Sequence, residues 1–150
     1  MIRSPRPARR AHLAIMLALL ALASACSKPT APTPELITDT FTGVLNVQGT
    51  QSNNFTVKYT AQDTAASLTV TSLRLASTNA EFPSTIGVAF GAFDINGVCQ
   101  RAAGFVVDTA AINQELTTPE VFSVGGWCVQ IFDAGTLTEA VNYTMVVKHY

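Results

Sequence analysis

The chain of 150 residues is 48% hydrophobic and 13% charged, which gives room for one globular domain and not for two. All ten acidic residues but only five of the nine basic residues follow Ala25, so the chain beyond that point has a net charge of −5. Because that part holds no cluster of Lys or Arg, it lacks the charges that neutralise phosphates, and we expect no nucleic-acid partner.

The first 25 residues have the three parts of a bacterial signal peptide. Four arginines lie within the first ten residues, an apolar run extends from Leu13 to Ala23, and small residues precede Cys26. The apolar run is too short to span a bilayer as a stable helix. We therefore expect residues 1–25 to be removed on export, so that the mature protein begins at Cys26 outside the cytoplasm.

The segment Leu22–Cys26 resembles the lipobox of bacterial lipoproteins, in which the cysteine receives a diacylglyceryl group before cleavage. Ala23 departs from that motif, which more often has Leu there. The alternative is a plain A-x-A site for the ordinary signal peptidase, and both sites cut the same bond. The resemblance implies a membrane anchor through lipid on Cys26, and Ser27 implies the outer membrane if the organism is Gram-negative.

The number of cysteines supports lipidation independently. Three cysteines are an odd number for an oxidising compartment, where a spare thiol invites intermolecular pairing. Lipidation of Cys26 leaves Cys99 and Cys128 to form a disulfide, whose loop of about 30 residues is worth about 3–4 kcal/mol. A metal site is the alternative, but no histidine or third cysteine lies near them in the sequence.

Residues 26–38 are expected to form an extended tether, because three prolines lie there among small polar residues. From 39 to 150, apolar and polar residues alternate with a period of two, as in strands that bury one face. Turn-forming residues separate these stretches. The pattern predicts an all-β domain, an antiparallel and jelly-roll-like β-sandwich of about seven or eight strands.

The alternation also predicts where strands turn or bend. Gln51–Asn53 is expected to be the turn of a hairpin whose second strand begins near Phe55. The apolar phase shifts by one residue between Val70 and Leu73, which predicts a β-bulge or the end of a strand. Residues 104–116 fit no single period and are assigned to strand or loop.

The stretch 86–92 has apolar residues on one face and almost no side chains on the other. Gly87, Ala89 and Gly91 form the bare face, where we expect the second sheet to approach closely, although a flat ligand or partner strand would also fit. Asp94–Gly97 then predicts a turn.

The segment Gly126–His149, with Gly97–Cys99 upstream, resembles uncharacterised bacterial lipoproteins that carry a small sandwich. These are similar in layout to pre-peptidase C-terminal domains, in which a penultimate strand ends in aromatic-Asp and the final strand is built around a Tyr. The resemblance covers about residues 41–149. It implies a β-sandwich accessory module, and it implies no activity and no ligand.

The sequence contains no recognisable catalytic constellation, so we expect no enzyme, cofactor or metal. His149 is the sole histidine after Ala25 and is expected to lie in a solvated tail, where it could not act as a preorganised base. A hydrolase that uses two carboxylates is the distant alternative. Its candidate side chains are Asp63, Glu81, Asp94, Asp108 and Asp133.

Two further groups of residues have a structural and a functional interpretation. Asp94, Asn96 and Asp133 could supply oxygen ligands to Ca²⁺, but we expect the two aspartates to stabilise turns. Trp127 could offer a platform for stacking on sugar, but it shares its phase with Val129, which favours a place in the core.

These observations predict a non-catalytic lipoprotein tethered to the cell envelope that binds a protein or glycan partner. The alternative is an accessory domain that serves stability or spacing and has no small-molecule ligand. An exposed apolar or aromatic patch would favour the binding module.

Lipidation of Cys26 is the first testable prediction. Mass spectrometry of the mature N-terminus should find a diacylglyceryl adduct on Cys26, and Cys26→Ser should release the protein from membranes without unfolding the domain, because the tether lies outside the core. A free thiol on Cys26 in the mature protein would refute this.

Overall fold

Eight antiparallel strands make up the part of the chain that the structure describes. The computed structural model describes residues 34–58, 65–118 and 122–150, and no helix occurs within them. The strands are β1 (Ile37–Leu45), β2 (Thr50–Val57), β3 (Ser67–Leu75), β4 (Ile86–Phe93), β5 (Cys99–Ala110), β6 (Glu115–Thr117), β7 (Gly125–Phe132) and β8 (Val141–His149). The predicted signal peptide and Cys26 lie outside the described residues. Over the ranges just given, no helix is long and apolar enough to cross a membrane.

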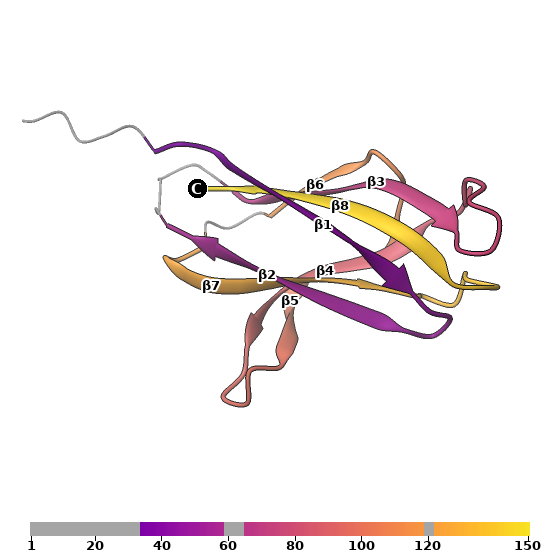
Figure 1. Cartoon of the computed structure of the whole chain (residues 1–150). Coiled ribbons are helices and arrows are strands. Elements are labelled where there is room, and N and C mark those ends of the chain that lie inside the picture. The colour runs from indigo at the N-terminus through magenta and orange to yellow at the C-terminus, as the bar shows by residue number, and fades with distance from the viewer. Residues whose placement is uncertain (1–33, 59–64, 119–121) are drawn as a thin grey trace, which may run out of the picture. The chain divides into compact units, whose positions relative to one another are not determined.

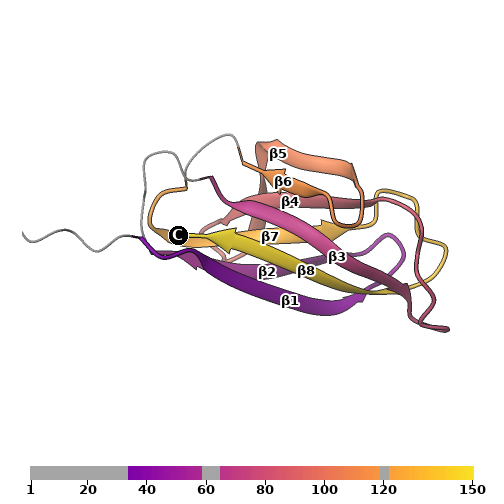
Figure 2. The same ribbon diagram turned by 90° about the horizontal axis from the view of Figure 1, so that it is seen from above.

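The strands form two four-stranded sheets that pack face to face (Figures 1 and 2). Sheet A has the order β1-β8-β3-β6, and sheet B has the order β2-β7-β4-β5. The first strand pairs with the last, the second with the seventh, the third with the sixth and the fourth with the fifth. The chain is thus one long hairpin rolled into a sandwich, and the predicted jelly-roll-like fold is confirmed.

The core lies between the two sheets and follows from the alternation in the sequence. Every second residue of β8, from Val141 to Val147, is buried against the inner face of sheet B, and the residues between them face outward. β4 and β7 supply the opposing layer, so the predicted inward phases are confirmed for these three strands. The most deeply buried aliphatic side chains are Leu45, Leu68, Val70, Leu73, Ile86, Val129, Ile131, Val141, Met145 and Val147.

The predicted shift of phase in β3 is a β-bulge. Val70 lies opposite Met145 and Ser72 lies opposite Thr144, so Thr71 is the extra residue. The bulge lets both Val70 and Leu73 point into the core on either side of the shift. The ambiguous region 104–116 contains the end of β5, a turn and the start of β6, as strand or loop.

The predicted hairpin turn at Gln51–Asn53 is wrong. These residues lie inside β2, and the chain turns earlier, where the N–H of Gly49 donates to the carbonyl oxygen of Asn46. β1 and β2 do not pair with each other, because the turn carries the chain from sheet A to sheet B. β2 is an edge strand whose first five residues are all polar, so the composition of this half resembles that of a turn. β1 also begins at Ile37, slightly before the expected end of the tether.

The bare face of β4 is covered, but not by the second sheet. A Cβ on Gly87 would overlap the ring of Phe132, and a Cβ on Gly91 would overlap the carbonyl oxygen of Gln100. Both neighbours lie on the outer face of sheet B, because the inner face carries Val88. The glycines therefore make room for the chain's own β5 and for a side chain of β7.

Replacement of Gly91 by Ala tests this close approach. Gly91→Ala should lower the free energy of unfolding by about 1–3 kcal/mol, since the added methyl group meets backbone that cannot move independently. Gly126→Ala is the control, because no atom lies within 4 Å of the added Cβ and its φ is not positive. Chemical denaturation of both variants should separate them. Equal stabilities would contradict the proposed packing.

Candidate functional site

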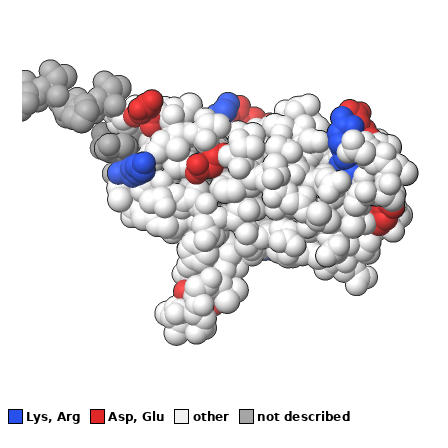
Figure 3. Space-filling view, in the orientation of Figure 1, with Lys and Arg blue, Asp and Glu red and all other residues white. Residues whose placement is uncertain are grey.

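The hairpin between β4 and β5 projects from the outer face of sheet B, away from sheet A (Figure 1). Its tip carries Ile95, whose side chain is fully exposed, and Val98, which is 53% exposed. In the space-filling view the projection stands clear of the body and carries little charge (Figure 3). Ile95 and Val98 together form an aliphatic surface that adds no buried area to the core, and we take this hairpin as the candidate functional site.

The turn at the tip is held by Asp94. Its Oδ1 accepts hydrogen bonds from the N–H of Asn96 at 2.8 Å and of Val98 at 2.9 Å, and its Oδ2 accepts one from the side-chain amide of Gln100. The Val98 N–H is the largest cause that lowers the pKa of Asp94 below its ordinary value. Gly97 has a φ of 76°, which favours glycine, so the predicted turn is confirmed.

A disulfide anchors the base of the hairpin. Cys99, the first residue of β5, is bonded to Cys128 of β7, and their Cα atoms lie 6.0 Å apart. β4 lies between these two strands in sheet B, so the disulfide joins strands that are not neighbours in the sheet. The predicted pairing of Cys99 with Cys128 is present, and it ties the projecting hairpin to a central strand.

Gln130 of β7 supports the hairpin from below through its buried side-chain amide. Its Nε2 donates to the carbonyl oxygen of Cys99 at 2.9 Å and to Ser52 at 3.2 Å, and its Oε1 accepts from Arg101 Nε at 2.7 Å. The Arg101 guanidinium also lies 3.6 Å from the centre of the Phe132 ring. These contacts connect β2, β5 and β7 across the outer face, so the base of the hairpin is fixed.

Sequence reasoning missed Arg101, Gln130 and Phe132 as parts of this site. The available signal was the outward phase of β7, in which Cys128, Gln130 and Phe132 alternate with core residues. Long side chains that share the outward phase of a strand with a cysteine indicate that another segment of the chain packs on the outer face of the sheet. The bare face of β4 also predicts a close neighbour. That neighbour is β5 and the Phe132 ring, and not the second sheet.

Trp127 is half-buried beside the core. Its ring lies 4.3 Å from that of Phe122, measured between ring centres, and its indole N–H donates to the carbonyl oxygen of Ser123. One face of the ring and its polar atom are therefore already in use. No Phe, Tyr or Trp within the described ranges is classed as exposed, so these ranges offer no open aromatic platform for a sugar.

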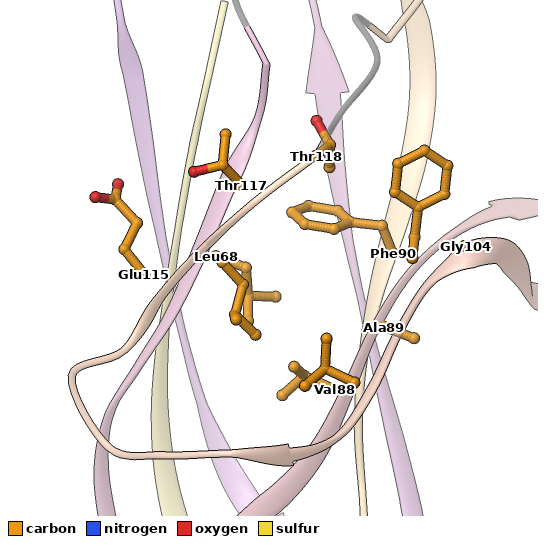
Figure 4. A pocket seen from close by; sticks show the side chains of 11 residues that line it. Leu68, Val88, Ala89, Phe90, Gly104, Glu115, Thr117 and Thr118 are labelled. Carbon is orange, nitrogen blue, oxygen red and sulfur yellow. The ribbon is translucent and has the colours of Figure 1, made fainter.

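A small apolar pocket opens at the edge of the sandwich formed by β5 and β6, between β3 and β6 on one side and β4 and β5 on the other (Figure 4). Leu68, Val88 and Phe90 line its floor, and Glu115 and Thr117 lie toward its rim. Its volume is about 180 Å³, below the about 300–1,000 Å³ that is usual for ligand pockets. It has room for a single apolar side chain and not for a larger ligand.

The two aspartates considered for Ca²⁺ stabilise two separate turns. Asp94 holds the hairpin tip, and Asp133 follows β7, where its Oδ1 accepts the N–H of Gly135, Thr136 and Leu137. Its Oδ2 accepts the N–H of Gln48 at 2.8 Å. Nowhere in 34–58, 65–118 or 122–150 do three His, Cys, Asp or Glu side chains form a group that could hold a metal ion.

The carboxylates proposed for a hydrolytic pair have separate surroundings. Glu81 forms an exposed ion pair with Arg74 at 3.7 Å, and Asp108 is exposed on β5. Asp63 lies outside the described residues. The carboxylate oxygens of Asp94 and Asp133 accept hydrogen bonds from backbone N–H groups in two separate turns.

The expectation that His149 lies in a solvated tail is wrong. It is the last residue of β8, its side chain is 2% exposed, and its Nε2 lies 2.9 Å from Oδ2 of Asp39. The centre of its ring lies 5.0 Å from that of Phe55. The backbone of His149 also pairs with Ile37 of β1, so the end of β8 is part of sheet A. Its Nδ1 is buried and has no hydrogen-bond partner among the described atoms. The pair thus links β1 and β8.

Comparison with known proteins adds no assignment. No protein-family model matches the chain, and a search of curated proteins finds no significant match. The resemblance to pre-peptidase C-terminal layouts stays a prediction.

Asp133 gives the domain a predictable response to acid. Partial desolvation acts to raise its pKa, but the N–H groups of Gln48, Leu137, Gly135 and Thr136 together lower it. A lowered folded-state pKa stabilises the protein above the unfolded value near 3.9, and this contribution is lost as the pH falls through the folded pKa. Asp133→Asn should therefore cost about 1 kcal/mol at pH 7, and less below pH 4.

Urea denaturation at pH 7 and at pH 3 measures this difference. Asp108→Asn is the matched control, because Asp108 is exposed on β5. A loss of stability in Asp133→Asn that is equally large at both pH values would contradict the role of the charge.

Proposed function

We propose that the mature chain is a non-catalytic, lipid-anchored protein of the cell envelope that binds a protein partner through the tip of the β4–β5 hairpin. The observation that carries the proposal is the full exposure of Ile95 on a turn whose base is fixed by the Cys99–Cys128 disulfide. A rigid support lowers the entropy that is lost on binding, so a small apolar tip can contribute usefully to affinity.

The chemistry of the tip favours a protein over a glycan. Ile95 and Val98 offer aliphatic surface, which fits an apolar pocket on a protein and offers no flat ring for stacking on sugar. The hydrogen-bonding atoms of Asp94 are already taken by the turn and by Gln100, so few remain for sugar hydroxyl groups. The tip therefore supports a contact that depends on shape and apolar burial.

Site-specific photo-crosslinking in intact cells tests this function. A benzophenone amino acid placed at Ile95 of the full chain should give a discrete covalent adduct with one protein. The same probe at Val124, which is 60% exposed and lies outside the hairpin, just before β7, is the control and should give none. Equal adduct patterns at both positions would favour the accessory domain without a partner.

A second variant separates recognition from mere proximity. With the probe at Val98, Ile95→Ser should reduce the yield of the adduct about tenfold or more, as expected for a residue that dominates a contact. Ile95 is fully exposed, so its replacement should leave the domain folded. An unchanged yield would show that the tip is near a neighbour without binding it.

A further inference from the structure

We propose that the free edge of β1 pairs with β1 of a second copy of this chain, in antiparallel orientation about a twofold axis at Phe41. The inference is independent of the hairpin, because β1 lies at the edge of sheet A and the hairpin projects from sheet B. The pairing would join the two copies of sheet A into one continuous sheet of eight strands.

β1 presents an open edge among the described residues. All nine of its residues pair with β8 on one side, and on the other side it has no neighbour in sheet A. In any strand every second residue directs its N–H and C=O away from the paired neighbour, so β1 offers a row of unpaired backbone groups. Such an edge is a template for another strand.

The remaining edges are less suited to pairing. β6 has only three residues, and the pairing of β5 with β4 is interrupted by two shifts of register. β2 carries Asn53 and Asn54 side by side, residues that are depleted in strands, and Arg101 reaches Thr50 at its start. β1 has no lysine, proline or bulge, which are three of the devices that keep edges apart, and its one charged residue, Asp39, is held by His149.

The outward face of β1 suits a second copy in particular. Thr38, Thr40, Thr42 and Val44 are exposed and uncharged, and threonines opposite each other stabilise antiparallel pairs. Figure 3, seen from the side on which β1 and β2 lie, shows most of this side free of Lys, Arg, Asp and Glu between its two ends. No like charges would therefore meet along the shared edge.

We choose the register of the two β1 strands that pairs the largest number of their residues. An axis at Phe41 pairs all nine residues of β1 with the second copy, so that Thr40 faces Thr42 and Thr38 faces Val44. Asp39, the one charged residue of β1, then faces Gly43 and stays with His149 of its own chain. Its carboxylate needs no new partner on association, so it does not oppose the pairing.

Paired cysteines test this register in the full chain. In a Thr38→Cys, Val44→Cys double variant, each new cysteine faces its counterpart in the other copy, so oxidation should give a covalent dimer on a non-reducing gel. The two positions lie about 20 Å apart within one strand, so they cannot pair in the same copy. Each single variant is a control and should give no covalent dimer on the same gel. A double variant without dimer, or singles with as much dimer, would overturn the proposal.

Charge variants provide a second measurement that does not depend on oxidation. Native mass spectrometry of the detergent-purified full chain should show a dimer for the wild type. Thr40→Lys with Thr42→Lys should make it monomeric, and Thr40→Glu with Thr42→Lys should restore the dimer, because unlike charges then face each other. A monomeric wild type would overturn the proposal, as would failure of the opposite charges to restore association. Thermal unfolding of each variant checks that the domain remains folded.

Discussion

The turn between β4 and β5 determines how all eight strands pair. Because the chain is one long antiparallel hairpin, each strand of the first half pairs with the strand equally far from this turn in the second half. Rolling the hairpin then brings β8 beside β3 and β7 beside β4, which completes the two sheets. The inner faces bury the apolar phase of each strand, and the fold depends on keeping these registers, since a slip of one residue would expose the core.

The outer face of sheet B is stabilised differently from the core. There the buried side-chain amide of Gln130 forms three hydrogen bonds, to β2 and β5, and the Arg101 guanidinium packs on Phe132. Glycines in β4 allow this layer to lie close to the sheet. The disulfide and the polar network hold the hairpin against the sheet, whereas hydrophobic burial holds the two sheets together. The tip of the β4–β5 hairpin can therefore be held rigidly although its side chains are exposed and add nothing to the core.

Most of the fold could be predicted because strands that bury one face must alternate, and the bulge at Thr71 appeared directly as a shift of that alternation. The first half of β2 could not be located in the same way, since its run of polar residues resembles a loop in composition. The tip of the candidate site was predictable as a turn and its base as a disulfide. The contacts of Arg101 and the burial of His149 were not, because they join residues far apart in the chain through geometry that no local pattern records.

The pairing of β1 with β8 also has a consequence for synthesis. Ile37 lies opposite His149, and β8 is the strand that separates β1 from β3 in sheet A. Because the chain is made from β1 onward, β1 has no strand to pair with in its own sheet until β8 is also available. Sheet A therefore cannot assemble progressively, and folding is delayed by its dependence on contacts between distant segments. A chain that lacked β8 would leave β1 and β3 without their shared neighbour in sheet A.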